Sequence, residues 1–505
     1  MSDRATALDR LSSESFDLLV VGAGVTGARI AYDASHAGLR VALVDAGDVA
    51  GGTSSASSKL LHGGFRYLAR RSYRLVHDAG RERHVLATQV ASHLSRPLPV
   101  VLTMERGRWP EWQLQYGLML YHGLSGFRRP RPRLLDPDEA REIAPELQTA
   151  EQRIHILLPE FQTDDSRLVL ATALGAARMG AVVVPYVEVA GIGGSNGRVD
   201  TVELLDRLGG EHLSVRVRSV VNASGPCIDR VRALEDPRSS PIARLSKGVH
   251  VTLPLPPGWS ALVAFYSPDD RTSFAAPWRG TLLVGTTDTE YDGDPLLVET
   301  NEDDIAEVLE GVAQLLPAER IERSRILASW AGLRVLPRGD GDTAVASREH
   351  LLSVGPRGVV SIAGGKLTTH RRMATDALGL LPAELRPRKL DLRPAPLPGS
   401  EPSLDGAGLT AAAGEDAARH LRSVYGSEAH RLLAYANEPD AFERIHPDGP
   451  DVWAQVRYAV EHELASTADD VVWRRTSLAH RGLATEDVRA AVTERMTESQ
   501  PVPVV

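Results

Sequence analysis

Cysteine, lysine and long apolar runs are all scarce in this chain of 505 residues. Cys227 is the only cysteine, which excludes an internal disulfide and a metal cluster held by thiolates, and favours a reducing compartment. The longest apolar run, residues 18–28, is far shorter than the ~20 residues needed to cross a bilayer. The first 16 residues are polar and charged, so we expect no signal peptide.

An excess of positive charge is also absent. The chain carries 57 lysine and arginine residues against 66 aspartate and glutamate residues, which gives a formal net charge of −9. A general nucleic-acid-binding protein is usually basic, so we expect no nucleic-acid partner. The few lysines are Lys59, Lys247, Lys366 and Lys389. We hypothesise that a chain which otherwise uses arginine keeps lysine where a compact ammonium group is needed.

Residues 16–380 alternate short β-branched runs with helical patterns and open with a βαβ unit. That unit comprises a strand at 16–21, a helix at 28–38 and a strand at 40–44. Later strand-like runs follow one another without helices between most of them: 182–189, 199–205, 213–221, 249–253, 262–266 and 281–284, with a hairpin turn at Gly209–Gly210. We predict an α/β fold, with a doubly wound parallel sheet interrupted by a mostly antiparallel insert.

The C-terminal part of the chain has a different composition. Residues 381–402 are rich in proline, which is typical of a semi-rigid linker. Beyond them, apolar residues such as Val452, Val456 and Val460 recur at helical spacing. We therefore predict a helical domain over 403–505, and its sequence shows no obvious catalytic constellation.

The segment after the first predicted strand matches the pattern GxGxxG through Gly22, Gly24 and Gly27. A strand precedes it, a helix follows, and Asp45 ends the second strand 18 residues after Gly27. Gly22 permits the tight turn, Gly24 lets a pyrophosphate approach the backbone, and Gly27 allows close packing of the helix on the strand. The N-terminus of the helix favours phosphate, and Asp45 can accept a hydrogen bond from a ribose hydroxyl. The pattern predicts a dinucleotide site.

Two further glycine-rich segments favour FAD over NAD. Residues 51–64 are rich in glycine, serine and threonine and follow Asp45 directly, where an NAD enzyme usually continues with another βαβ unit. The pair Gly364-Gly365 falls between a predicted strand at 359–362 and a helix. Hydroxyl groups and backbone amides in such segments can surround the phosphates and ring edge of a flavin.

Several longer motifs resemble those of the FAD-dependent glycerol-3-phosphate dehydrogenases of the aerobic, quinone-linked type. The motifs are TSSASSKLLHGGFRYL (53–68), NASGPCIDRV (222–231), RLSKGVHV (244–251), LVGTTDTEYDGDP (283–295), WAGLRVLP (330–337), GGKLTTHRRMA (364–374) and VEHELASTADDVVWRRTSLA (460–479). They extend over nearly the whole chain.

The resemblance implies an FAD-binding domain of the glutathione-reductase/amino-acid-oxidase type, an antiparallel substrate domain and a C-terminal helical domain. We expect FAD binding by about 16–75, 160–245 and 340–380. We expect substrate binding by about 76–159 and 246–339, within an oxidoreductase region of 16–380.

The activity implied is oxidation of sn-glycerol 3-phosphate to dihydroxyacetone phosphate by hydride transfer to flavin N5, with electrons passed to a quinone or another acceptor. The expected partners are glycerol 3-phosphate, that acceptor and a second copy of the chain in a homodimer. We expect a cytoplasmic protein, peripheral on the inner face of the cell membrane.

The same resemblance assigns the site residues. The expected cofactor contacts are Gly22, Gly24, Gly27, Asp45, Thr53, Ser54, Ser58, Lys59, Leu60, His62, Gly63, Gly64, Asn222, Gly225, Gly365, Lys366, Leu367 and Thr368. The expected substrate contacts are Arg66, Tyr67, His250, Arg334, Arg348 and Lys366, of which His250, Arg334 and Lys366 are the expected catalytic residues. Cations in this number suit a phosphate dianion. No metal site is expected.

Alternatives stay open at this point. His250 is a candidate general base, and a deprotonated cation is the other. Arg334 is followed by Val335, where relatives tend to have proline, so another polyol phosphate such as erythritol phosphate, or a hydroxy or amino acid, is an alternative substrate. A non-catalytic flavin-binding sensor or scaffold is an alternative from another class.

Residues 109–133 combine aromatic residues with a basic flank that includes Arg128, Arg131 and Arg133. Such a helix can lie in a lipid interface and attract anionic headgroups. It can equally be a buried helix of the substrate domain with a solvated basic loop. A quinone-reducing function favours the first interpretation.

Overall fold

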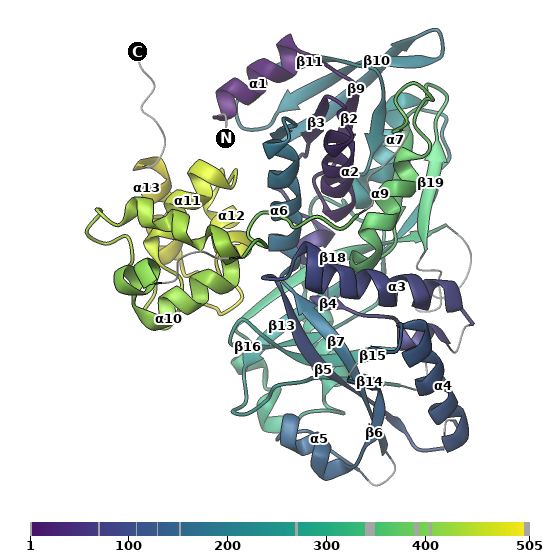
Figure 1. Ribbon diagram of the computed structural model, residues 1–505, viewed down its shortest axis with the longest axis vertical. Coiled ribbons are helices and arrows are strands. Elements are labelled where there is room, and N and C mark those ends of the chain that lie inside the picture. The colour runs from purple at the N-terminus through teal and green to yellow at the C-terminus, as the bar shows by residue number, and fades with distance from the viewer. Residues whose placement is uncertain are drawn as a thin grey trace.

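The computed structural model of the protein describes residues 3–68, 71–107, 109–128, 130–150, 153–267, 271–338, 349–387, 393–402 and 407–498. Three β-sheets, the helices that pack against them and a group of C-terminal helices make up this part of the chain (Figure 1). Within it, no helix is both long enough and apolar enough to cross a membrane.

A six-stranded sheet holds the N-terminal βαβ unit. Its strands, in spatial order, are β19 (His350–Val354), β20 (Val360–Gly364), β12 (Val220–Asn222), β2 (Leu18–Val21), β3 (Val41–Val44) and β8 (Val182–Val184). All neighbours run parallel except the edge strand β19. Leu18 and Val20 face one core, whereas Leu19 and Val21 face another, because successive residues of a strand point to opposite faces. The strands are therefore apolar on both sides, as parallel sheets require.

Different elements pack against the two faces of this sheet. One face packs against α2 (Val25–His36), α6 (Asp165–Arg178) and α9 (His370–Leu378). The other packs against α1 (Arg4–Ser13), α7 (Ile228–Glu235) and a four-stranded sheet. That sheet consists of β1 (Ser15–Phe16), β11 (His212–Val217), β10 (Arg198–Asp206) and β9 (Val187–Ser195). β10 and β11 form the predicted hairpin.

Two runs that we predicted as single strands are each divided between two sheets. Residues 182–189 form β8 and β9, with a break at Pro185 and Tyr186, because proline offers no N–H to a ladder and Tyr186 has φ +59°. Residues 213–221 form β11 and β12, with a break at Arg218 and Ser219. Apolar patterning gave no sign of either change of sheet, since buried valines lie on both sides of each break, such as Val183 and Val187 or Val215 and Val221.

A ten-stranded sheet forms the second region and is antiparallel apart from the pair β14–β5. Its strands are β4 (Leu60–Leu61), β5 (Ser95–Glu105), β6 (Arg133–Leu135), β7 (Arg153–Thr163), β13 (Ala243–Pro254), β14 (Leu262–Tyr266), β15 (Thr272–Trp278), β16 (Thr281–Gly285), β17 (Thr289–Tyr291) and β18 (Ala328–Pro337). Its helices are α3 (Tyr73–Val85), α4 (Glu111–Leu124), α5 (Pro137–Ile143) and α8 (Glu302–Val312).

Short helical turns connect these elements. They are η1 (Thr53–Ser55), η2 (Phe65–Leu68), η3 (Leu86–Val90), η4 (Gly225–Cys227), η5 (Ala318–Arg320), η6 (Arg323–Arg325) and η8 (Leu367–Thr369).

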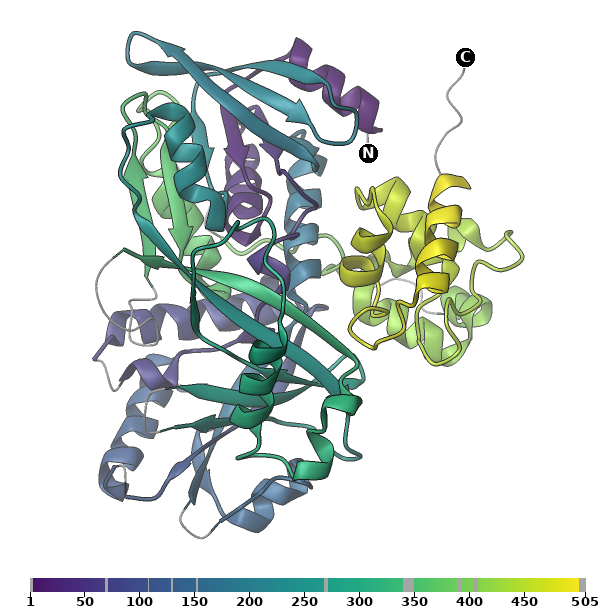
Figure 2. The ribbon, with the colours of Figure 1, turned by 180° about the vertical axis from the view of Figure 1, so that it is seen from behind.

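The C-terminal residues form the predicted helical region. Its elements are α10 (Ala407–Tyr425), η9 (Gly426–Tyr435), α11 (Trp453–His462), α12 (Ala468–Asp470), η10 (Val471–Arg475) and α13 (Glu486–Glu498). These helices have apolar cores of their own and lie beside α6, on the side of the molecule opposite α4 (Figures 1 and 2). A buried ion pair of 2.7 Å joins Arg167 of α6 to Glu463.

Candidate active site

The turn between β2 and α2 is the glycine-rich segment that the sequence singled out. Gly22 has φ +102°, a conformation that favours glycine. A Cβ on Gly27 would lie 1.8 Å from the carbonyl oxygen of Gly22, so the helix approaches the turn this closely only because Gly27 lacks a side chain. α2 begins directly after Gly24, and the N–H of Val25 donates to Ser54 Oγ (2.9 Å). The turn and the serine-rich segment therefore hold each other in place.

Two acidic side chains follow β3. The Asp45 carboxylate accepts hydrogen bonds from the backbone N–H of Ala23 (2.6 Å) and of Gly47 (2.8 Å). Burial raises the pKa of Asp45 to about 6, although these two hydrogen bonds act in the opposite direction. Burial would also raise the pKa of Asp48, but the guanidinium groups of Arg475 and Arg474 hold it below its ordinary value.

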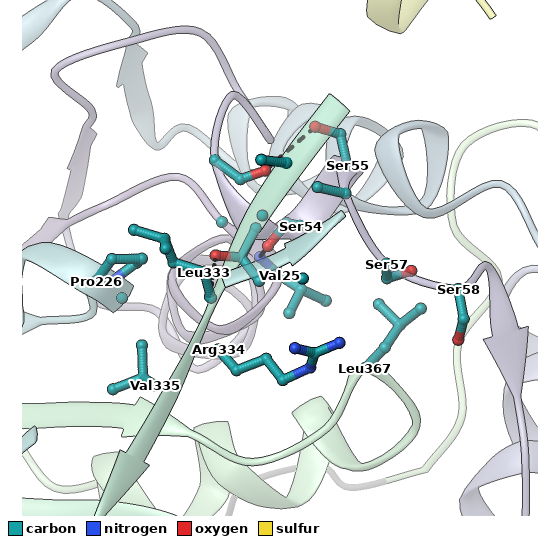
Figure 3. Close-up of a pocket in the computed structure, with 18 of the residues that line it drawn as sticks. Val25, Ser54, Ser55, Ser57, Ser58, Pro226, Leu333, Arg334, Val335 and Leu367 are labelled. Carbon is teal, nitrogen blue, oxygen red and sulfur yellow. Dashed lines mark hydrogen bonds between the residues drawn. The ribbon is translucent and has the colours of Figure 1, made fainter. Parts of the chain in front are cut away.

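A cavity of about 1300 Å³ extends from this turn into the ten-stranded sheet. Its volume exceeds the ~300–1,000 Å³ of an ordinary small-molecule pocket, so it can hold a long ligand and a second, smaller one. Figure 3 shows the serines of residues 54–58, Leu367 and Arg334 around one part of it.

Most of the predicted cofactor contacts line this cavity. They are Gly22, Gly24, Asp45, Thr53, Ser54, Ser58, Leu60, His62, Gly225, Gly365, Lys366, Leu367 and Thr368. Within the described residues, the others do not line it: Gly27, Lys59, Gly63, Gly64 and Asn222.

Three of these five residues make contacts next to the cavity wall instead of lining it. Lys59 is buried, and its Nζ lies 2.7 Å from Asp165 Oδ1. Asn222 Oδ1 accepts from the Ser224 hydroxyl (2.6 Å), and Gly63 N–H donates to Glu160 Oε2 (3.2 Å). Lys247, another of the four lysines, is likewise paired, with Asp304 at 2.6 Å. Buried carboxylates thus hold two of the four lysines, and Lys389 lies outside the described residues.

The pairing of β13 with β18 and β16 forms the far end of the cavity. His250 lies opposite Trp330 on β18 and opposite Gly285 on β16, and Ser246 lies opposite Arg334. Trp330 and Arg334 lie on the same face of β18, since four residues separate them. Strand register therefore brings His250 and Arg334 together from segments about 80 residues apart.

Arg334 lies within a strand rather than in a loop. It donates hydrogen bonds to Thr286 Oγ1 (2.8 Å) and to the carbonyl oxygen of Thr287 (3.0 Å). A Cβ at Gly248 would lie 2.4 Å from this guanidinium, so the missing side chain at Gly248 makes room for it. The Asp288 carboxylate is 3.9 Å away.

Lys366 brings a second positive charge to the cavity. Its Nζ lies 3.4 Å from the centre of the Tyr67 ring, a cation–π contact, and both residues line the cavity. The side chain of Arg66 and the whole of Arg348 lie outside the described residues, so their predicted roles stay predictions.

His250 is buried beside Phe274 and Trp330. Burial lowers its pKa to about 3, with the charges of Arg334 and Lys59 acting in the same direction. The imidazole is therefore neutral near pH 7. Among the described residues its Nδ1 has no hydrogen-bond partner, so no protein group fixes the tautomer at that nitrogen.

Sequence reasoning missed several residues of the cavity wall. Trp330 could have been found, because it alternates with Gly332 and Arg334 on a predicted substrate-domain motif. Trp473, Arg474 and His480 also line the cavity, although they belong to the C-terminal helices. No local sequence pattern predicts them as site residues, because they reach the cavity only through the packing of that region on α6 and β13.

Comparison with known proteins accounts for most of the chain. The FAD dependent oxidoreductase family matches residues 17–371, and the C-terminal domain of alpha-glycerophosphate oxidase matches residues 393–500. The glycerol-3-phosphate dehydrogenase of Mycobacterium leprae is 34% identical over 505 residues, covering 95% of this chain and 85% of that protein. The chain belongs to the glycerol-3-phosphate dehydrogenase family of FAD-dependent oxidoreductases.

Other proteins of this glycerol-3-phosphate dehydrogenase family are also similar to the chain. The mitochondrial enzyme of Macaca fascicularis is 34% identical over 537 residues, covering 98% of this chain and 72% of that one. The glycerol-3-phosphate dehydrogenase from Bacillus halodurans, solved in complex with FAD, has a TM-score of 0.75 at 28% identity and covers 99% of this chain and 98% of its own. L-proline dehydrogenase from P. horikoshii shares the fold (TM-score 0.57, 17% identity). The predicted resemblance, the fold and FAD as the family's cofactor are confirmed.

The residues present fit FAD. Gly22, Gly24 and Val25 line the cavity, so the backbone at the start of α2 is accessible to a pyrophosphate. Each oxygen of Asp45 accepts one backbone hydrogen bond and keeps further lone pairs for a ribose hydroxyl. Leu367 and Thr368 line the same cavity.

Proposed function

We propose that the protein oxidises sn-glycerol 3-phosphate to dihydroxyacetone phosphate with FAD as hydride acceptor. The observation that carries the proposal is that Arg334, Lys366 and His250 line the same cavity as the dinucleotide turn. The names of the relatives support the same activity. When bound, FAD supplies the acceptor for the hydride and its two electrons.

The residues proposed to hold the cofactor fall into groups, and each group binds a different part of FAD. The turn at Gly22 and Gly24 and the N-terminus of α2 take the pyrophosphate, and Asp45 takes the adenosine ribose. Ser54 lines the cavity beside the turn, and Thr53 lines it beside β18, where its Oγ1 donates to the carbonyl oxygen of Leu333 (2.7 Å). Residues 365–368 line the cavity beside the proposed substrate end.

Substrate binding is proposed to rest on Arg334 and Lys366, helped by Tyr67 and by Arg66 and Arg348. A phosphate monoester carries a charge of roughly −2 near neutral pH. Charge-assisted hydrogen bonds contribute about 1.5–3 kcal/mol each, so two of them contribute about 3–6 kcal/mol, which corresponds to binding at millimolar to tens of micromolar concentration. The planar guanidinium of Arg334 suits bidentate contact, and Lys366 is a compact charge that can approach the reacting oxygen.

Loss of hydride from the central carbon requires loss of a proton from its hydroxyl group. We propose the neutral His250 imidazole as the base, and the proton leaves on it. The bound phosphate dianion would offset the charge of Arg334, one of the causes that lower the pKa of His250. Lys366 is proposed to stabilise negative charge on the oxygen that becomes the carbonyl.

Anaerobic addition of substrate to the FAD-loaded protein tests the activity. We expect glycerol 3-phosphate to bleach the flavin absorbance, and glycerol, which lacks the phosphate, to leave it unchanged at equal concentration. Arg334→Ala should raise the concentration needed for half-maximal bleaching at least tenfold. Arg338→Ala, an exposed arginine beyond the end of the same strand, is the matched control. Bleaching by erythritol phosphate or an amino acid alone would overturn the proposed substrate, and no bleaching by any of them would favour a sensor or scaffold.

The domain boundaries expected from the sequence are proposed as they stand. The six-stranded sheet contains strands from each of the three FAD-binding segments, and the ten-stranded sheet contains most strands of the two substrate-binding segments, which supports the division.

A homodimer is proposed as well, and sedimentation velocity of the loaded protein tests it.

We also propose a quinone as acceptor and a membrane surface as partner, for which α4 gives the support. Trp112, Tyr116 and Met119 are 69%, 57% and 63% exposed, and their spacing places them on one stripe of the helix. The opposite stripe, with Leu118 and Tyr121, is buried. A helix that only covers the substrate region needs one apolar stripe, whereas α4 has two. Aromatic residues with a basic flank suit the interface of an anionic membrane.

Flotation with vesicles tests this surface. We expect the protein to float with phosphatidylglycerol vesicles and less with phosphatidylcholine vesicles. A variant with serine at positions 112, 116 and 119 should stay at the bottom. The matched control changes Leu352 and Val354, exposed apolar residues of β19, to serine and should float like the wild type. Loss of flotation in both variants, or in neither, would refute the assignment to α4.

A further inference from the structure

Trp330 lies between the proposed base and the C-terminal helices. On one side its ring stacks on His250, with ring centres 6.0 Å apart and planes at 21°. On the other side it meets His480 edge-on at 4.9 Å and Trp473 at 6.2 Å. His480 and Trp473 also touch each other, at 5.4 Å. All four rings line the cavity, so a continuous aromatic path joins the C-terminal region to His250.

His480 is fixed to the strand that carries His250. Its carbonyl oxygen accepts a hydrogen bond of 2.8 Å from Thr252 Oγ1, and Thr252 is two residues from His250 on β13. The His480 side chain is buried, with an exposed fraction of 5% for the residue. The backbone hydrogen bond to Thr252 and the burial of the His480 ring therefore both hold His480 against Trp330.

Buried charges anchor the segment that carries Trp473. Asp48, next to the dinucleotide turn, accepts from Arg475 Nη1 (2.9 Å) and Nη2 (2.8 Å) and from Arg474 Nε (2.5 Å). Arg279, at the end of β15, pairs with Asp164 and donates to the carbonyl oxygen of Thr476. Residues 471–475 adopt a π-helical turn, a form that occurs frequently at functional sites. The anchor fixes Trp473 relative to both ends of the cavity.

We propose that Trp473 and His480 are positioning residues for the reaction: they fix Trp330, and Trp330 fixes the His250 imidazole against the substrate. The proposal rests on the proposed function, since it takes His250 as the base. It gives the C-terminal helices a part in catalysis. Without this contact the Trp330 ring can rotate, and His250 loses the surface on which it stacks.

Rapid-mixing measurements of flavin bleaching test the proposal. In Trp473→Ala and His480→Ala we expect the limiting bleaching rate to fall about tenfold. The half-saturating glycerol 3-phosphate concentration should change less than twofold, because Arg334 and Lys366 are untouched. Trp473→Phe should recover most of the rate. Tyr458→Ala is the matched control: it removes a buried aromatic ring of the same region that does not line the cavity, and should keep the wild-type rate.

A second readout does not depend on activity. In protein labelled with ¹⁵N-histidine, with His250→Gln to assign the signal, the His250 resonance should shift or broaden in Trp473→Ala and stay in place in Tyr458→Ala. If the alanine variants do not fold, Trp473→Leu and His480→Leu keep the volume and carry the same expectation.

The outcomes separate the two proposals. Wild-type rates in both variants, or an equal loss in Tyr458→Ala, would overturn the positioning role. If wild-type protein fails to bleach with glycerol 3-phosphate, the proposed function fails, and the His250 resonance then decides on its own whether the aromatic path holds that ring.

Discussion

The two ends of the cavity are built in different ways. At the dinucleotide end, the site consists mostly of backbone groups and of glycines that leave room for the ligand. Asp45 is the acidic side chain among them. At the substrate end, strand register positions Arg334 and His250, and Lys366 comes to the same cavity from a third segment. The first end is therefore sensitive to added atoms, and the second to lost functional groups.

The largest effect is expected from an added side chain at the first end. In Gly27→Val the new Cβ would lie 1.8 Å from the Gly22 carbonyl oxygen, and backbone must move to accommodate it. We expect no folded, FAD-loaded protein, as measured by flavin content and circular dichroism. Gly24→Ala is the control for folding, because its Cβ would meet only a side-chain hydroxyl at 3.0 Å. A yellow, stable Gly27→Val protein would show that close helix packing is not what this end requires.

The converse effect is expected at the second end. Lys366→Ala removes a cation without adding an atom, and we expect turnover with glycerol 3-phosphate to fall by about 10²–10³-fold while FAD stays bound. Lys366→Arg tests the need for a compact ammonium group and should recover less than a tenth of the activity. Lys59→Arg should instead lower thermal stability, since Lys59 is buried against Asp165. Release of flavin from Lys366→Ala would place this residue at the first end of the cavity.

The same contrast explains what the sequence could predict. The GxGxxG turn, its flanking strand and helix and Asp45 are contiguous, so their spacing alone was enough to predict a dinucleotide site. His250 and Arg334 came from a family resemblance, because nothing in either local segment says that β13 and β18 pair. Neither motif spacing nor the family resemblance predicted His480 and Trp473 as site residues, because their place at the cavity depends on how the C-terminal helices pack.

Burial was the other property that the sequence did not carry. Residues 182–189 and 213–221 look like single strands because valines recur through each of them, yet each crosses from one sheet to another. Lys59 lies inside a cofactor motif, yet its charge is turned away from the cavity towards Asp165. A motif predicted which segments surround the ligand, and the structure was needed to say which side chains face it.

A moderate effect is expected for Asp45, the side chain on which the first end depends. Because burial raises its pKa to about 6, the free protein loses the ionised acceptor as the pH falls through 6. We expect the dissociation constant of FAD to rise severalfold between pH 7.5 and 5.5. Asp45→Asn should bind FAD about tenfold more weakly at pH 7.5, with little further change on acidification. Fluorescence titration of the apoprotein measures both. An equal pH dependence in the variant would assign the titration to another group.

The smallest effect is expected away from both ends. His155 of β7 is buried, and its Nδ1 lies 3.0 Å from Thr103 Oγ1. Burial lowers its pKa to about 4, helped by Arg153 and Arg141. Since this value is below the ~6.5 of an unfolded histidine, its contribution to stability is complete above pH 6.5 and declines as the pH falls towards 4. At pH 5 the loss amounts to about 2 kcal/mol. Urea unfolding of His155→Gln should therefore show a weaker loss of stability between pH 7 and 5 than the wild type. Its FAD affinity should stay unchanged, because His155 touches neither end of the cavity.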